Sequence, residues 1–410
     1  MLINIELMNK TILQINLSAN VGSHGRIAEE IGKAVMEQGW RSVIAYGRSA
    51  NPSKNELVRI GSTFDVYEHL IETRLFDNHG LASRCATKRF IEKTKVLKPD
   101  IIHLHNIHGY YLNYRIIFEY LNKLDIPIVW TLHDCWSFTG HCGQYLMVDC
   151  RKWEIGCNNC PQHKEEYPSS YIDRSGRNYE LKKSLFSANK HLHIVPVSEW
   201  MADNVRHSFF KNADVRVIHN GIDIQTFKPR TDRKKNTKTR ILGVSNVWTA
   251  YKGLKDFYKL RDMLSEDDFD ITLVGLTKAQ ILELPHGIIG VERTQSVSEL
   301  ADIYANSDFF VNPTYCDTFP TVNIEALACG TPVITYNVGG SPEAVDKATG
   351  WVVPKGDVEA IAAIVKRESI KDESEIEVQR KACRERSVSE YNKEDRYKDY
   401  ITLYKELLHE

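Results

Sequence analysis

The sequence predicts an α/β protein with two doubly wound domains, each built on a parallel sheet. Short apolar runs with the length of buried strands alternate with longer helical stretches along most of the chain, an order typical of parallel sheets covered by helices. A polar, basic segment at residues 229–240 separates two such series. The chain has 410 residues, which is enough for two or three domains.

The first series opens with the strand TILQIN at residues 11–16, a loop containing Gly22 and Gly25, and a helix at about 26–38. Because glycine has no Cβ, such a loop lets the backbone approach a ligand closely. A Gly-x-x-Gly pattern alone is equally typical of a plain turn, so its place between a strand and a helix is what favours a ligand loop. Further apolar runs predict strands at residues 42–46, 98–105, 127–134, 195–198 and 215–218.

The second series begins with a strand at residues 240–245 and continues with strands at 271–275 and 309–311. Residues 391–408 have the apolar spacing of a helix. These patterns place the domain boundaries as follows: a first domain at 1–228, a linker at 229–240, a second domain at 241–385, and a C-terminal helix at 386–410.

Residues 312–345 contain the strongest functional signal. A strand ends at Asn312-Pro313, a helix is predicted from Thr321 to Cys329, and the next strand is Pro332-Val333-Ile334-Thr335. Open parallel sheets bind ligands beyond the carboxyl ends of their strands, and a helix N-terminus there favours anions. Asp317 and Glu325 lie at this end, so paired acids that can accept hydroxyl hydrogen bonds sit beside an anion site. The combination suits a sugar-diphosphate ligand.

This stretch resembles the donor-binding signature of retaining glycosyltransferases of the GT-B fold, family 4 type, including those of bacterial surface polysaccharides such as colanic acid. Ala-Cys-Gly-Thr-Pro-Val and Gly-Gly-Ser-Pro-Glu match as well. The resemblance implies two Rossmann-like domains facing a cleft, with the C-terminal helix crossing back to the first domain. It implies that Glu325 binds the ribose hydroxyls and that Asp317 contacts the donor sugar. Aspartate departs from the usual glutamate and shortens its reach by one methylene.

The resemblance extends to other positions. Lys252, in Lys-Gly-Leu, matches a lysine that pairs with the donor diphosphate, whereas the arginine usually found several residues earlier is missing. His133, in Leu-His-Asp, matches a donor-contacting histidine and is a candidate catalytic residue with Asp317 and Lys252. The remaining residues implied to contact the donor are Gly22, Gly25, Arg293, Phe319, Pro320 and Thr321.

Four cysteines fall between two of the predicted strands, in an insertion at residues 136–161. Cys142, Cys150, Cys157 and Cys160 end in Cys-x-x-Cys, a spacing that fits a closed tetrahedral zinc site. The loop is long and lacks apolar periodicity, so it needs something to hold it in place. The sequence therefore predicts a structural zinc, with four reduced thiols as the alternative.

Composition excludes some partners. The net charge of −1 gives no global field for nucleic acid, and no apolar run approaches the ~18 residues of a membrane span. A basic helix at about 81–98 is either a solvated face or a weak contact with anionic membrane. No signal peptide is recognisable, so we expect a cytoplasmic protein, peripheral at most on the inner face of the membrane.

The expected function is transfer of a hexose-type sugar from a nucleotide diphosphate to a growing lipid-linked bacterial surface glycan (capsule, O-antigen or exopolysaccharide). No catalytic cofactor is expected, because Asp268-Phe269-Asp270 is more typical of a polar turn than of a metal-binding Asp-x-Asp. Two alternatives remain: a nucleotide-sugar epimerase of the same fold, and an inactive glycan- or nucleotide-binding relative.

Overall fold

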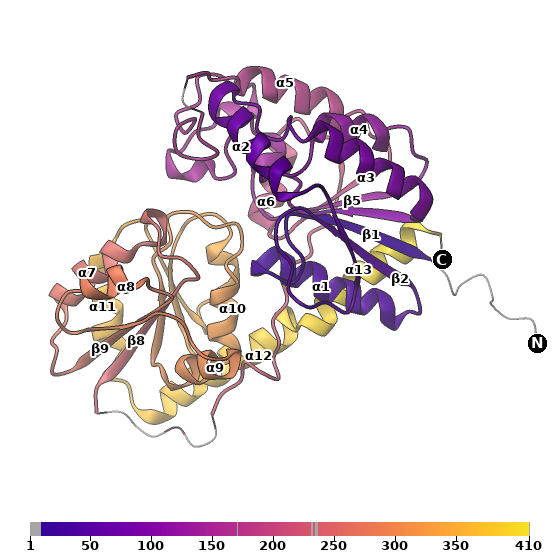
Figure 1. Ribbon diagram of the computed structural model, residues 1–410. Coiled ribbons are helices and arrows are strands. Elements are labelled where there is room, and N and C mark those ends of the chain that lie inside the picture. The colour runs from indigo at the N-terminus through magenta and orange to yellow at the C-terminus, as the bar shows by residue number, and fades with distance from the viewer. Residues whose placement is uncertain (1–9, 170, 231–232, 234–236, 410) are drawn as a thin grey trace, which may run out of the picture. The chain divides into compact units, whose positions relative to one another are not determined.

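A computed structural model (Figure 1) describes residues 10–169, 171–230, 233 and 237–409. The chain divides into two compact units: unit 1 combines residues 1–219 with 397–410, and unit 2 comprises residues 220–396. Of the predicted linker at 229–240, residues 231–232 and 234–236 lie outside the described part. Each unit contains one parallel sheet with helices, which confirms the predicted α/β class.

Unit 1 contains, within the described residues, a seven-stranded sheet of order β3-β2-β1-β4-β5-β6-β7, with every neighbouring pair parallel. The strands are β1 (Thr11–Asn16), β2 (Arg41–Tyr46), β3 (Glu56–Arg59), β4 (Ile101–Leu104), β5 (Ile128–Leu132), β6 (Leu192–Pro196) and β7 (Asp214–Val215). The strand order reverses between β1 and β4, which marks the place where open sheets bind ligands.

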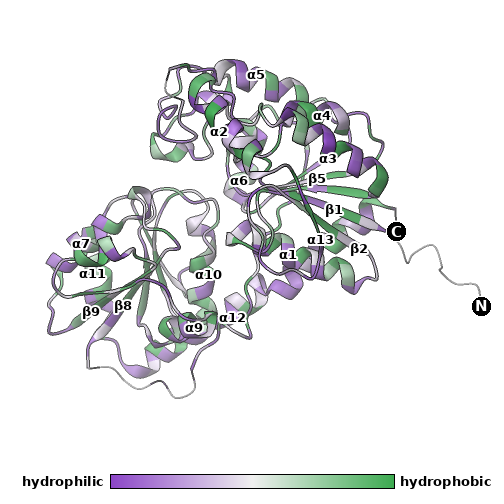
Figure 2. Cartoon of the chain, in the orientation of Figure 1, coloured by the Kyte–Doolittle hydropathy of each residue, from purple (hydrophilic) through white to green (hydrophobic). Residues whose placement is uncertain are grey.

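Side-chain alternation along the strands gives the sheet of unit 1 two buried faces. Ile12 packs in one apolar cluster with α1 (Gly22–Glu37) and α13 (Lys393–Leu407), whereas Leu13 packs in the other. The remaining helices of the unit are α2 (Thr63–Phe76), α3 (Arg84–Leu97), α4 (Tyr114–Leu121), α5 (Ser175–Phe186) and α6 (Glu199–His207). Hydrophobic residues concentrate in the strands of both units, and hydrophilic ones are mixed along the helices (Figure 2).

Unit 2 contains, in its described part, a six-stranded parallel sheet of order β10-β9-β8-β11-β12-β13. Its strands are β8 (Thr239–Val244), β9 (Phe269–Val274), β10 (Ile288–Val291), β11 (Phe309–Asn312), β12 (Val333–Tyr336) and β13 (Gly350–Val353). Its helices are α7 (Leu254–Met263), α8 (Lys278–Leu282), α9 (Val297–Asn306), α10 (Thr321–Ala328), α11 (Val358–Glu368) and α12 (Glu373–Tyr391). Here the order reverses between β8 and β11.

The strand expected at 215–218 is the two-residue β7, Asp214–Val215, and two predicted helices differ in their extent. The helix expected from residue 26 begins at Gly22, so both loop glycines belong to its first turns. The helical pattern at 391–408 continues α12, which ends at Tyr391, into α13, which starts at Lys393. Asn392 between them has extended backbone angles, which separate the two helices. Its side-chain amide donates a hydrogen bond to the carboxylate of Asp395 in the first turn of α13.

Candidate functional site

In unit 2 the predicted donor residues gather at the carboxyl ends of β8 and β11. Lys252 lies in a short turn after β8, and its Nζ is 2.7 Å from Asp317 Oδ2 in the loop after β11. Burial lowers the pKa of Lys252, but the charge and hydrogen bond of Asp317 outweigh this, so the pKa is raised overall. The two residues matched to opposite roles therefore bind each other.

The turn that carries Lys252 is fixed to the loop after β11. Gly253 has φ +74°, and a Cβ at this position would overlap the carbonyl oxygen of Pro313. The amide of Tyr315 donates to the carbonyl of Tyr251 at 2.7 Å. Glycine after the lysine is thus required by backbone conformation and by close approach.

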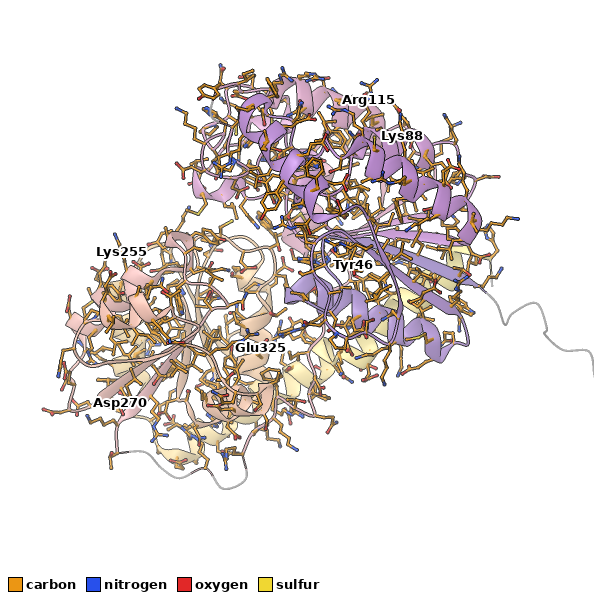
Figure 3. The ribbon with its side chains drawn as sticks, in the orientation of Figure 1. Tyr46, Lys88, Arg115, Lys255, Asp270 and Glu325 are labelled. Carbon is orange, nitrogen blue, oxygen red and sulfur yellow. The ribbon has the colours of Figure 1, made fainter. Side chains whose placement is uncertain are left out.

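Helix α10 begins at Thr321, four residues after Asp317. Pro320 precedes it and gives no side-chain cap, and the first turn contains no acidic residue, so its amides keep a positive end available at Thr321. Glu325, one turn further along α10 (Figure 3), accepts a hydrogen bond from Tyr304 Oη at 3.0 Å. Tyr304 is fully buried, so it fixes the orientation of this carboxylate.

Three of the residues implied to contact the donor have surroundings that the resemblance did not indicate. Phe319 and Pro320 are buried, and the ring of Phe319 packs 5.7 Å from that of Tyr391, so both residues contribute to packing beneath the loop. Arg293 is exposed just after β10, the edge strand of the sheet.

Sequence reasoning missed a buried support for the site. Asp256, in the first turn of α7, accepts hydrogen bonds from Tyr315 Oη at 2.7 Å and Tyr336 Oη at 2.9 Å. These bonds connect the helix that follows Lys252 to the loop after β11 and to β12. The position of Asp256, four residues after Lys252, was the only feature of the sequence that could have indicated this support. Neither tyrosine lies in a recognisable motif.

In unit 1 the carboxyl ends of β1, β4 and β5 bring histidines together. His133 Nε2 is 3.1 Å from His105 Nδ1, and His105 Nε2 is 2.9 Å from Gln14 Oε1. Gln14 uses its amide nitrogen to donate to Ala28, so its oxygen accepts from His105. Burial lowers the pKa of both histidines well below the usual value, so each carries one proton. His105 is then protonated at Nε2, and His133 donates from Nε2 and presents Nδ1 as an acceptor.

His24 also reaches this place and was not predicted, although it lies between the two glycines of the first loop. Its Nδ1 is 3.0 Å from Asn16 Oδ1, and its ring centroid is 6.2 Å from that of His133. A Cβ at Gly25 would lie 3.1 Å from Ser18 Oγ, whereas Gly22 has φ +69° and open space around it. Gly25 is therefore a packing residue, and Gly22 lies where a ligand could approach.

A second polar cluster follows β4 and β5. His108 Nε2 is 2.9 Å from Asp134 Oδ2, and Tyr167 Oη is 2.9 Å from His108 Nδ1. Burial raises the pKa of Asp134, but the charge and hydrogen bond of His108 and the amide of Trp136 lower it by more. The pKa of Asp134 is therefore lowered overall. This cluster places a carboxylate, an imidazole and a tyrosine from the segment after the cysteine-containing insertion at the same sheet edge.

The structure does not support the predicted zinc site. Cys142, Cys150, Cys157 and Cys160 line one small cavity, yet no group of three or more His, Cys, Asp or Glu residues in the described part has an arrangement that could hold a metal ion. The Cys142 thiol instead hydrogen-bonds Cys160, which lowers the pKa of Cys160 to about 7, and burial raises the pKa of Cys157 to about 11.

Ordinary packing holds the insertion. Buried Lys182 donates to the carbonyls of Trp136 at 2.6 Å and Thr139 at 3.0 Å, and its Nζ lies 3.4 Å from the centroid of the Trp136 ring. His141 bonds buried Asp77 at 2.8 Å, and Trp153 packs against two further aromatic rings. These contacts come from α5 and from residues before α3, so they cannot be read from the sequence of the insertion itself. The sequence therefore predicted a metal where packing holds the loop.

Comparisons with known proteins agree with this geometry. The family described as Glycosyltransferase Family 4 matches residues 24–226, and the family described as Glycosyl transferases group 1 matches residues 238–368. The chain belongs to the family 4 glycosyltransferases. A relative from Escherichia coli (strain K12), named as the colanic acid biosynthesis glycosyl transferase WcaC, is 26% identical over 380 residues, covering 87% of this chain and 90% of its own.

Solved structures show that this family 4 glycosyltransferase has the GT-B fold. Sucrose-phosphate synthase from Thermosynechococcus elongatus aligns over 98% of this chain and 99% of its own, with a TM-score of 0.72 and 18% identity. Anabaena Alr3699/HepE, solved in complex with UDP and glucose, aligns over 96% and 98%, with a TM-score of 0.65 and 15% identity. In the described residues no helix combines the length and apolarity of a membrane span.

Proposed function

We propose that this glycosyltransferase transfers a hexose, with retention of anomeric configuration, from a nucleotide diphosphate to a lipid-linked saccharide in the assembly of a bacterial surface polysaccharide. The observation that carries the proposal is the Lys252–Asp317 pair beside the uncapped N-terminus of α10, with Glu325 on the same helix. The WcaC relative supports the glycan class, and the UDP complex of Anabaena Alr3699/HepE supports a nucleotide-sugar donor.

The chemistry follows from the charges at this site. A donor diphosphate brings negative charge to Lys252 and to the amides of α10, which stabilise the charge that develops as the bond from the anomeric carbon to the phosphate oxygen breaks. The acceptor hydroxyl forms the new bond to that carbon, and its proton goes to the leaving phosphate. The sugar acquires oxocarbenium character, and Asp317 is the carboxylate proposed to offset it. Glu325 binds the ribose hydroxyls.

The test is the release of nucleoside diphosphate. The purified protein should release it from a nucleotide sugar only when a lipid-linked saccharide is present, and the product should keep the donor's anomeric configuration by NMR. Conversion of the nucleotide sugar without acceptor would indicate the epimerase instead. An absence of turnover across donors, with nucleotide binding retained, would indicate the inactive relative.

The positioning of Glu325 gives a separate prediction. Tyr304→Phe removes one hydrogen bond to a carboxylate and leaves the buried ring, so we expect KM for the nucleotide sugar to rise about tenfold with kcat little changed. Glu325→Ala should lose both affinity and turnover. Steady-state kinetics with varied donor concentration will show this split. A lower kcat with unchanged KM for Tyr304→Phe would place Glu325 at the reacting carbon instead of the ribose.

The membrane contact proposed for the basic helix rests on fewer charges than the sequence indicated. Arg84 of α3 forms a two-point pair with Glu72 of α2 at 2.7 and 2.9 Å, Arg89 lies 3.8 Å from Asp65, and Lys95 is paired with Glu92. Lys88 (Figure 3), Lys93 and Lys98 form no ion pair with the described residues. These three lysines are the cations available to an anionic surface.

A further inference from the structure

His24 lies at the carboxyl edge of the unit 1 sheet, in the first turn of α1 and after the loop that follows β1. Its ring centroid is 6.2 Å from that of His133, which follows β5, and the two ring planes are inclined by 47°. The side chain of His24 is only partly buried, and Gly22, two residues before it, has open space around it. A ligand at this edge can therefore reach the imidazole of His24.

The hydrogen bonds around Asn16 fix the position of the proton on His24. The side-chain nitrogen of Asn16 donates to the carbonyl of His24 at 3.1 Å, and its side-chain oxygen accepts from the Leu17 amide at 2.8 Å. Because these two bonds orient the Asn16 amide, its oxygen also accepts from His24 Nδ1 at 3.0 Å. Burial lowers the pKa of His24 to about 4, so the neutral ring carries its proton on Nδ1 and a lone pair on Nε2.

This lone pair needs a hydrogen-bond donor. Among the described residues, Nε2 of His24 has no hydrogen-bond partner. The neighbouring polar groups are acceptors as well: Asp134, whose charge acts on His24, is a carboxylate, and His133 has its proton on Nε2, toward His105. A matching ligand must therefore bring donors. A sugar hydroxyl can donate, whereas an ionised phosphate or carboxylate can only accept.

We propose that Nε2 of His24 accepts a hydrogen bond from a hydroxyl group of a reacting sugar, so that His24 is a substrate-contacting residue. The inference rests on the proposed glycosyl transfer and names the substrate group that this edge of unit 1 recognises. The hydroxyl belongs to the hexose of the nucleotide donor or to the saccharide acceptor, which offer the same chemistry. A His24 that only supports the loop would need its Nδ1 bond to Asn16 and nothing more.

Two substitutions separate contact with the sugar from support of the loop. His24→Asn places an amide nitrogen near the Nδ1 position, so it can keep the bond to Asn16 while it loses the Nε2 acceptor. His24→Gln carries an oxygen near the Nε2 position and restores the acceptor. We expect kcat/KM to fall about 3- to 10-fold for His24→Asn, the effect of one hydrogen bond between uncharged groups, and to recover in part for His24→Gln. The matched control is His207→Asn at the exposed end of α6, because His207 also bonds through Nδ1, to the carbonyl of Asp203 at 2.8 Å.

Sugar analogues test the direction of the bond and identify its source. The donor arm uses UDP-glucose and UDP-galactose with their monodeoxy and monodeoxyfluoro forms, and the acceptor arm uses octyl glucoside and octyl galactoside with the same changes. At one ring position the parent should lose about 3- to 10-fold for both changes, since fluorine cannot donate a hydrogen bond, and His24→Asn should show no further loss there. The arm that contains this position identifies the sugar. Parental kcat/KM for His24→Asn would overturn the proposal, as would losses that multiply fully at every position.

A second measurement does not depend on turnover. Diethyl pyrocarbonate acylates an unprotonated imidazole nitrogen, so mass spectrometry should find His24 labelled in the protein alone and protected by at least one of the unmodified sugars. Exposed His207 and His286 should be labelled equally in both conditions. Equal labelling of His24 with and without sugar would overturn the proposal.

The two proposals fail in different ways. If no protein shows turnover but a sugar still protects His24, the transferase proposal is overturned and the saccharide contact stands. If the parent transfers sugar and His24→Asn does so equally well, the contact is overturned and the transferase stands. All variants should melt at the parental temperature at neutral pH, and where His24→Asn melts lower, the labelling of the parent decides.

Discussion

Lys252→Met is expected to lower kcat by a factor of about 10² to 10³, the range found when one group that stabilises a developing anion is removed. Methionine keeps the unbranched stem and removes the ammonium. Asp317→Asn should also reduce kcat, because it removes the charge that offsets the oxocarbenium ion. The measurement is initial-rate kinetics with saturating donor.

The Lys252–Asp317 contact of 2.7 Å makes the double variant informative. If the pair merely supports the loop, Lys252→Met and Asp317→Asn together should cost no more than either alone. If each acts on a different part of the donor, their effects on kcat should multiply. The control is Lys255→Met, an exposed lysine three residues later (Figure 3), which should keep the parental rate. Parental kcat for Lys252→Met would remove Lys252 from the mechanism.

Acid should unfold unit 1 well before unit 2. Six histidines of unit 1 have lowered pKa values, and desolvation is the main cause for all six. The pKa is about 4 for His24, about 3 for His69 and His103, and well below the usual value for His79, His105 and His133. A histidine with a folded pKa below the unfolded value of ~6.5 binds a proton on unfolding between those two pH values. The free energy of unfolding of unit 1 is therefore undiminished by these histidines above pH 6.5, and it falls as the pH decreases toward 4.

Each such histidine lowers the free energy of unfolding of unit 1 by about 2 kcal/mol at pH 5. The six contributions together are comparable with the whole stability of a domain. Unit 2 contains a single histidine, His286, which is exposed, so it serves as an internal control. Urea unfolding followed by hydrogen exchange between pH 7 and 5 should show unit 1 weakening first. His103→Gln should reduce the pH dependence by one proton, and His207→Gln, at an exposed site, should not change it. A parallel loss of both units would contradict the assignment.

The sequence was sufficient to predict the strands and helices whose apolar pattern lies within the element itself. The apolar runs around Ile12, Val129 and Phe310 predicted central strands. Lys252, Asp317 and Glu325 were identified by the family resemblance, and the sheet order of unit 2 brings the carboxyl ends of β8 and β11 together. Contacts between distant segments were not accessible. Tyr304 supports Glu325 from another helix, and Asp77 holds His141 from 64 residues away. Cysteine spacing predicted a metal because the competing packing around Lys182 has no local signature.

Helix α13 has a consequence for how the protein is made. Tyr404 bonds His103 at 2.6 Å, and Tyr400 lies 3.1 Å from Thr131, so residues of α13 complete the apolar face that begins with Ile12. On the ribosome, residues 1–219 of unit 1 are synthesised long before these tyrosines exist, and at ~5–20 residues per second the interval is on the order of ten seconds or more. Throughout that time β1, β4 and β5 expose apolar surface where α13 will later pack. The nascent chain is therefore a substrate for chaperones that bind such surfaces, and release should follow synthesis of α13.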